Sequence, residues 1–153
     1  MIIALYEPDI PQNTGTILRL GACLGVAVHI VGPAAFPATE KAFRRAGLDY
    51  LDHVQVVNHV SFDTFENWRR QEGRRVVLLS TKASLAHIDL AFRENDVLLC
   101  GRESSGVPEE VHRAADASVR IPMRTGLRSL NVAVSAAIVL GEALRQTGGF
   151  PHA

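Results

Sequence analysis

The sequence of 153 residues has few cysteines, few aromatic residues and no excess of charge of either sign. Its two cysteines, Cys23 and Cys100, stand among apolar residues and match no metal-ligand spacing, so we expect buried free thiols and no metal. No apolar run approaches the roughly 18–20 residues that cross a bilayer, which argues against a membrane protein. Residues 1–6 lack the positive segment and cleavage site of a secretory signal, so we expect a cytoplasmic protein.

The charge balance bears on possible partners. Lys plus Arg and Asp plus Glu number 16 each, which gives a formal net charge of zero. Because phosphate contacts usually produce a basic excess, this balance counts against a nucleic-acid binder. The basic residues are nevertheless clustered, although such clusters are most often solvated faces. The clusters are Lys41, Arg44 and Arg45; Arg69 and Arg70; Arg74 and Arg75; and Arg120, Arg124 and Arg128.

Strand-like and helix-like segments alternate along the chain, which predicts the α/β class. Strands separated by helices imply a mostly parallel six-stranded sheet flanked by helices, and we expect a single domain over residues 1–153. The hydrophobic fraction of 47% suits a globular chain of this length. The expected strands are 2–6, 26–31, 54–57, 76–79, 97–100 and 119–121, and the expected helices are 13–24, 40–46, 62–72 and 130–145.

Ligands of such sheets bind beyond the carboxyl ends of the strands, and three polar segments stand there. The first, residues 7–19, has two prolines that stiffen a loop, and Asn13 or Thr14 is placed to cap the following helix. A helix N-terminus suits a phosphate, and Arg19 follows on the polar side of the helix. The alternative is a plain helix cap with a surface arginine.

The second polar segment, residues 99–108, has a polar turn between Gly101 and Gly106, and Pro108 is expected to start a helix. It is not a P-loop, because Val107 and Pro108 stand where Lys and Ser or Thr are required. It is not a nucleophile elbow either, because Arg102 replaces the first glycine. The alternative is a structural loop.

The third polar segment, residues 121–131, leads into a helix that is apolar or small on nearly every side. A helix of that kind must be buried on most sides, which favours an oligomer interface or an unusual threading of the chain. In the alternative interpretation Ser129 or Asn131 is only an N-cap.

Together these segments resemble the SPOUT class of methyltransferases, and most of all its small single-domain branch, the TrmL (YibK-like) tRNA 2′-O-methyltransferases. The resemblance runs nearly end to end, in the same order, through residues 5–15, 44–50, 80–82, 101–108 and 121–131. It implies an α/β sheet whose C-terminal part forms a deep trefoil knot. It also implies S-adenosylmethionine held in the knot, no metal, and a homodimer formed through the last helix and the knot region.

The resemblance also implies roles for individual residues. The implied cofactor-binding residues are Leu79, Thr81, Gly101, Glu103, Ile121, Ser129 and Leu130. The implied catalytic or substrate-positioning residues are Arg19, Asn13, Ser129 and Asn131. The sequence departs from the family pattern at Arg102 and Ser105, which affects expected RNA contacts more than cofactor binding.

The implied reaction is methylation of the wobble ribose, of cytidine or uridine, in leucine tRNAs, with S-adenosylhomocysteine as the second product. Since the pKa of arginine lies above about 12, we expect Arg19 to stabilise the developing alkoxide rather than to accept its proton. Expected tRNA contacts are Arg44, Arg45, Arg124 and Arg128. Three alternatives stay open: a ribosomal RNA 2′-O-methyltransferase, a non-catalytic nucleotide- or RNA-binding module, and a dinucleotide-binding oxidoreductase. The last is disfavoured because no G-x-G-x-x-G follows the first strand.

Overall fold

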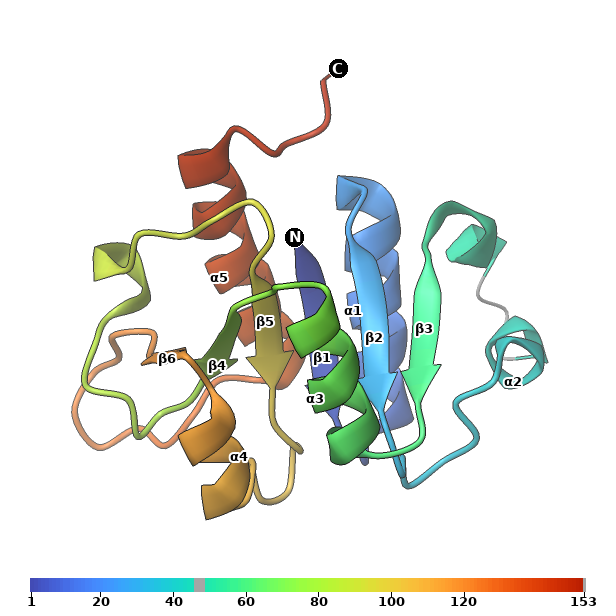
Figure 1. Ribbon diagram of the computed structural model, residues 1–153, viewed down its shortest axis with the longest axis horizontal. Helices are drawn as coiled ribbons and strands as arrows, with labels where there is room; N and C mark the ends of the chain where they lie inside the picture. Colours follow the sequence, from blue (N-terminus) through green and yellow to red (C-terminus); the bar gives the residue numbers. More distant parts are fainter. Residues whose placement is uncertain (46–48, 153) are drawn as a thin grey trace.

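A parallel six-stranded sheet, in the order β3-β2-β1-β5-β4-β6, forms the centre of the molecule (Figure 1). The computed structural model describes residues 1–45 and 49–152. The predicted α/β class and the six parallel strands are confirmed. The strands are β1 (Ile2–Tyr6), β2 (Ala27–Val31), β3 (Val56–His59), β4 (Val76–Leu79), β5 (Val97–Cys100) and β6 (Ala117–Val119).

Helices cover both faces of the sheet, as Figure 1 shows: α3 and α4 lie in front, α1 and α5 behind. The helices are α1 (Pro11–Leu24), α2 (Glu40–Arg45), α3 (Phe62–Gln71), α4 (Glu109–Ala114) and α5 (Val132–Thr147), with 3₁₀ turns η1 (Asp49–His53) and η2 (His87–Asp89).

The central strand β1 shows why two layers of helices are needed. All five of its residues are buried, and they alternate between two separate cores. Ile3 and Leu5 pack with residues of α1 and α5, whereas Ile2, Ala4 and Tyr6 join the core under α3 and α4. Side chains of a strand point alternately to its two faces, so a strand that is apolar throughout must be covered on both.

Several predicted boundaries are wrong by one or two residues. The strands expected at 54–57 and 119–121 lie at Val56–His59 and Ala117–Val119. Their limits follow the partner strand, because Val28–Val31 pairs with Val56–His59 and Val77–Leu79 pairs with Ala117–Val119. Apolar character alone does not contain that register.

The helix ends differ from prediction for local reasons. Helix α1 begins at Pro11, and Ile10 is its N-cap without a side-chain hydrogen bond, so the predicted cap at Asn13 or Thr14 is wrong. Pro108 is the N-cap of α4 rather than its first residue. Helix α5 begins at Val132, two residues later than predicted, because Asn131 caps it. The predicted end of α2 at residue 46 lies outside the described residues.

The expectation of two buried thiols is half right. Cys100 is buried in β5, but Cys23 is exposed near the end of α1, on the side turned away from the sheet. Among residues 1–45 and 49–152, no helix combines the length and the apolar character that a membrane crossing requires.

Candidate active site

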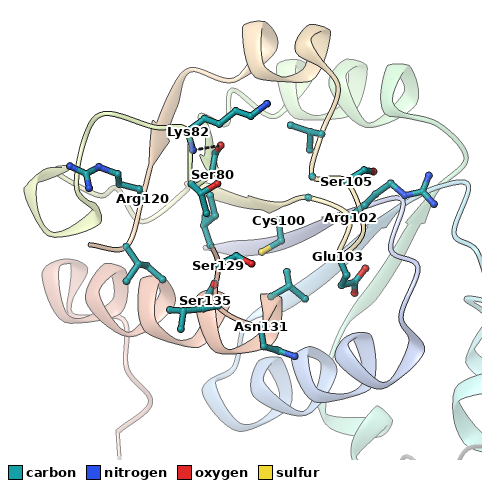
Figure 2. A pocket seen from close by; sticks show the side chains of 18 of the residues that line it. Ser80, Lys82, Cys100, Arg102, Glu103, Ser105, Arg120, Ser129, Asn131 and Ser135 are labelled. Carbon is teal, nitrogen blue, oxygen red and sulfur yellow. Dashed lines mark hydrogen bonds between the residues drawn. The ribbon is translucent and has the colours of Figure 1, made fainter. Parts of the chain in front are cut away.

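The three polar segments meet around one cavity of about 500 Å³ at the carboxyl edge of the sheet (Figure 2). The strands are parallel, so the loops that follow β1, β4, β5 and β6 all leave the sheet at this edge. The cavity falls in the range of about 300–1,000 Å³ typical of small-molecule sites. The structure thus joins segments that are separated in the sequence by as many as 120 residues or so into one site.

All seven residues predicted to bind a cofactor line this cavity. One ends β4 and one follows it, two follow β5, and three belong to the segment that leads to α5. They are Leu79, Thr81, Gly101, Glu103, Ile121, Ser129 and Leu130. Their role as cofactor ligands stays a prediction, but their positions make a shared ligand possible.

The turn after β5 is closed by its own backbone. The N–H of Arg102 donates to the carbonyl of Gly106, and the N–H of Gly106 donates back to the carbonyl of Arg102, both at 2.9 Å. A Cβ on Gly101 would lie 2.8 Å from Cα of Gly106, and Gly106 has a φ of +68°. A side chain at Gly101 would need a shift of the backbone, and one at Gly106 would be strained by the left-handed φ, so this turn favours glycine at both positions.

Two predicted catalytic residues, Asn13 and Asn131, are hydrogen-bonded to each other. Asn131 Oδ1 accepts from the backbone N–H of Ala133 and Val134, which fixes the side chain as the N-cap of α5. Its Nδ2 then donates to Asn13 Oδ1 at 2.9 Å. Asn131 is therefore both a helix cap and a link to α1. The predicted N-cap is confirmed, and a catalytic role for Asn131 stays a prediction. Asn13 lines the cavity, and its side-chain Nδ2 group donates to no described residue.

Arg19 does not join this group in the same chain. It lies further along α1, is exposed, and is absent from the residues that line the cavity. Its guanidinium lies 5.8 Å from the ring centroid of Tyr50, over the ring face. The structure therefore brings Asn13, Ser129 and Asn131 to the cavity and leaves Arg19 outside it.

The two residues that depart from the family pattern, Arg102 and Ser105, lie in different surroundings. Arg102 extends away from the cavity in Figure 2, where it forms ion pairs with Glu7 at 3.3 Å and Asp9 at 3.6 Å. Ser105 lies on the rim of the cavity. Arg102 is thus engaged with the loop after β1 in this chain.

Some lining residues were not predicted to have a role. Ser80 Oγ accepts from the backbone N–H of Lys82 at 3.1 Å, which shapes the turn after β4. Ser135 lies on the cavity side of α5. The sequence signal for Ser135 is a serine within the apolar first half of α5.

The cavity does not contain a reactive thiol or a metal cluster. Burial raises the pKa of Cys100 to about 12, so this thiol stays protonated near neutral pH. In the described part of the chain, no group of three His, Cys, Asp or Glu side chains is placed to hold a metal ion.

The basic clusters divide into internal and exposed residues. Arg69 pairs with Glu66 and Asp116, and Arg75 pairs with Asp96, so these arginines serve the fold. Arg44, expected to bind RNA, is held between two exposed carboxylates, those of Glu40 and Asp52. Arg124 and Arg128 are exposed beside the cavity and form no ion pair with any described residue.

Comparison with known proteins agrees with this geometry. Residues 1–141 match the SpoU rRNA Methylase family. A tRNA (cytidine(34)-2′-O)-methyltransferase of Ancylobacter novellus is 60% identical over 150 residues, which is 98% of this chain and 95% of the relative.

Solved structures show the same fold. A structure that concerns the 2-OH methylation of C/U34 on tRNA superposes with a TM-score of 0.86 at 40% identity, over 94% of this chain and 93% of the other. An AdoMet-bound rRNA methyltransferase from Sinorhizobium meliloti has a TM-score of 0.83 at 30% identity, over 94% of this chain and 55% of the other. The resemblance predicted from sequence is confirmed by these matches.

Proposed function

Because the chain belongs to the SpoU rRNA Methylase family, we propose that it transfers a methyl group from S-adenosylmethionine to the 2′-hydroxyl of the wobble nucleotide, cytidine or uridine 34, of tRNA. The observation that carries the proposal is the single cavity at which Asn13 and Asn131 meet the turn after β5. By the same resemblance the substrates are leucine tRNAs in the cytoplasm, and residues 1–153 act as one catalytic domain.

The cavity fits the proposed cofactor. Leu79, Ile121 and Val139 offer apolar surface for a flat base, while the turn between Gly101 and Gly106 allows close approach of a ligand to backbone. Glu103 places a carboxyl group at the same cavity, which suits a ligand that carries positive charge. When bound, S-adenosylmethionine supplies an electrophilic methyl group on a sulfonium.

The residues of the chain then have to orient the ribose and stabilise the alkoxide that develops at its 2′-oxygen. The Asn13–Asn131 pair lies on the cavity wall, where its remaining amide donor can orient the ribose. Arg19 provides a permanent positive charge that stabilises the developing oxyanion.

A homodimer explains how Arg19 reaches a methyl donor. Val134 and Ile138 are 47% and 39% exposed on consecutive turns of α5, and Ile10 and Leu130 are similarly exposed near its start. These four residues define an apolar face that a second copy would cover. Arg19 lies outside the cavity of its own chain. In the proposed dimer, the partner subunit's Arg19 therefore acts at that cavity.

The proposal includes the trefoil knot. Its support is the path of the chain after β6, where the backbone N–H and the carbonyl of Arg120 both form hydrogen bonds with the segment after β4. The N–H of Arg120 donates to the carbonyl of Leu85, and the N–H of His87 donates to the carbonyl of Arg120. The chain then reaches α5, which packs on α1 and β5.

The direct test is incubation of the protein with labelled S-adenosylmethionine and bulk tRNA, followed by nuclease digestion and identification of the methylated nucleotide. We expect label on the 2′-oxygen of nucleotide 34 of leucine tRNAs. Arg19→Ala should lower the transfer rate at least about a hundredfold while the cofactor binds with nearly wild-type affinity. A comparable loss of cofactor binding would contradict the role of Arg19.

The dimer is tested separately. Ile138→Glu should produce a monomer by sedimentation and lose transfer, whereas Val60→Glu, at an exposed position after β3, should stay dimeric. Mixing Arg19→Ala chains with chains that cannot bind cofactor should restore activity, since one of the two sites in a mixed dimer is then complete. A mixture as inactive as its parents would refute the sharing of sites.

Ribosomal RNA is the second candidate substrate, because the matching family is described by it. The same assay with ribosomal RNA in place of tRNA distinguishes the two. A protein that binds S-adenosylmethionine but methylates neither RNA would instead be a binding module.

A further inference from the structure

A reciprocal pair of hydrogen bonds joins the loop after β1 to the turn after β5. The backbone N–H of Asp9 donates to Glu103 Oε2 at 3.0 Å, and the backbone N–H of Glu103 donates to Asp9 Oδ1 at 3.1 Å. The hydroxyl of Ser104 donates to the second carboxylate oxygen of Asp9. Both oxygens of one carboxylate are therefore used to hold a turn 94 residues away in the sequence.

The surroundings keep Asp9 in its charged, acceptor-only form. Its side chain is 13% exposed, and the guanidinium of Arg102 lies 3.6 Å from Oδ2. Hydrogen bonds from Glu103 and Ser104 lower the pKa of Asp9 to about 2. Burial and the contact with Asp9 raise the pKa of Glu103. At neutral pH the Asp9 carboxylate accepts every hydrogen bond directed at it.

Asp9 does not line the cavity, but its neighbours on both sides of the contact do. Ile10 lines it from the end of the loop after β1 and Asn13 from the first turn of α1, and Gly101 through Val107 line it from the turn after β5. The turn is closed by two hydrogen bonds of its own backbone and has no room for a Cβ at Gly101, so the positions of its residues are linked to one another. A contact that holds Glu103 and Ser104 in place therefore also holds the rest of the turn that lines the cavity.

We propose that Asp9 is a positioning residue that sets the turn after β5 against the start of α1, and so sets the distance between the cofactor wall and Asn13. The inference rests on the proposed function, since it assigns the two walls to cofactor and ribose. Asp9 acts through Glu103 and Ser104 and touches neither substrate.

Two substitutions of Asp9 separate the hydrogen bonds of its carboxylate from its charge. Asp9→Asn keeps an acceptor for the N–H of Glu103, and its amide can donate to the Ser104 hydroxyl, which then accepts. Asp9→Ala removes the acceptors of the hydrogen bonds from Glu103 and Ser104, and Ser104→Ala removes only the second of these bonds. Asp63→Ala is the matched control, because Asp63 is an exposed aspartate on α3 that does not line the cavity.

The test is titration of the full-length chain with S-adenosylmethionine in a calorimeter. We expect the Kd to rise about tenfold for Asp9→Ala, about threefold for Asp9→Asn and for Ser104→Ala, and not at all for Asp63→Ala. Hydrogen exchange of the Glu103 amide, measured without ligand, should speed up in Asp9→Ala and stay protected in Asp9→Asn. A purely global destabilisation would instead speed exchange throughout the core.

Asp9→Ala chains that bind S-adenosylmethionine as tightly as wild type would overturn the proposal. So would Asp9→Asn chains that bind no better than Asp9→Ala. If Asp9→Ala does not fold, the Ser104→Ala and Asp9→Asn chains decide the question. A wild-type chain that binds S-adenosylmethionine but leaves RNA unmodified would contradict the proposed function alone, because the binding measurements do not depend on transfer.

Discussion

Acid should destabilise this protein through two buried histidines on neighbouring strands. His29 of β2 and His59 of β3 are 3% and 6% exposed, and His29 Nδ1 lies 2.8 Å from His59 Nε2. One of these nitrogens must donate and the other accept, so the contact requires an unprotonated ring. Trp68 covers both rings, with centroid distances of 4.5 and 5.3 Å. A proton on His29 would therefore be buried without a carboxylate among these contacts.

The size of the effect follows from the pKa of His29. Burial, and then the proximity of His59 and Arg74, lower this pKa from 6.5 to about 4. Below pH 6.5 the unfolded chain binds a proton that the folded chain refuses, so the free energy of unfolding falls as the pH falls. The full shift corresponds to about 3 kcal/mol at 1.36 kcal/mol per pKa unit, and about 2 kcal/mol of it is lost between pH 7.5 and pH 5.

The assay is urea unfolding followed by tryptophan fluorescence, at pH 7.5 and pH 5, for wild type and His29→Gln. Glutamine keeps a hydrogen-bonding partner for His59 but cannot take up a proton. We expect the variant to be less stable than wild type at pH 7.5 and to lose about 2 kcal/mol less on acidification. His53→Gln, at an exposed position, should change this pH dependence little. Equal pH dependence in wild type and His29→Gln would refute the reasoning.

Three further predictions concern single contacts. Gly101→Ala should lower affinity for S-adenosylmethionine at least about tenfold by calorimetry, because its Cβ would strike the backbone of Gly106; unchanged affinity would show that the turn can shift freely. Asp96→Ala should lower the free energy of unfolding by about 3 kcal/mol in urea at pH 7, because it leaves the Arg75 guanidinium without its buried partner; a loss below about 1 kcal/mol would contradict this. Asn131→Asp should keep the helix cap and thermal stability but lose transfer, because a carboxylate cannot donate the hydrogen bond to α1; full activity would exclude that role for the amide.

Apolar strands bounded by turn residues could be located from sequence because their pattern is local. Residues 2–6, 76–79 and 97–100 were predicted within the limits that the structure has. The strands at the sheet edge, β3 and β6, were displaced by two residues. Polar His59 lies inside β3 because His29 supplies its partner, and that partner is 30 residues away.

Residues that line the cavity could be predicted from the sequence, whereas the hydrogen bonds between its loops could not. The seven residues that the family resemblance predicts to bind the cofactor all line the cavity. The contacts of Asp9 with Glu103 and of Asn13 with Asn131 had no signal in the sequence, since each joins positions about a hundred residues apart. The misplaced cap at Asn13 has a local origin, because α1 already begins at Pro11 and Asn13 lies inside its first turn.

The sequence by itself determined the α/β class, the alternation that requires two layers of helices, and the placing of polar segments at strand ends, because all three follow from local periodicity and from the geometry of parallel sheets. Only the tertiary structure decided which side chains hold the segments together, and that Arg19 lies outside the cavity of its own chain. The physical reason is that hydrogen-bond partners and distances depend on how separate loops leave the sheet. The local pattern of residues along the chain does not reveal that path, because the bonds that hold the loops join positions about a hundred residues apart.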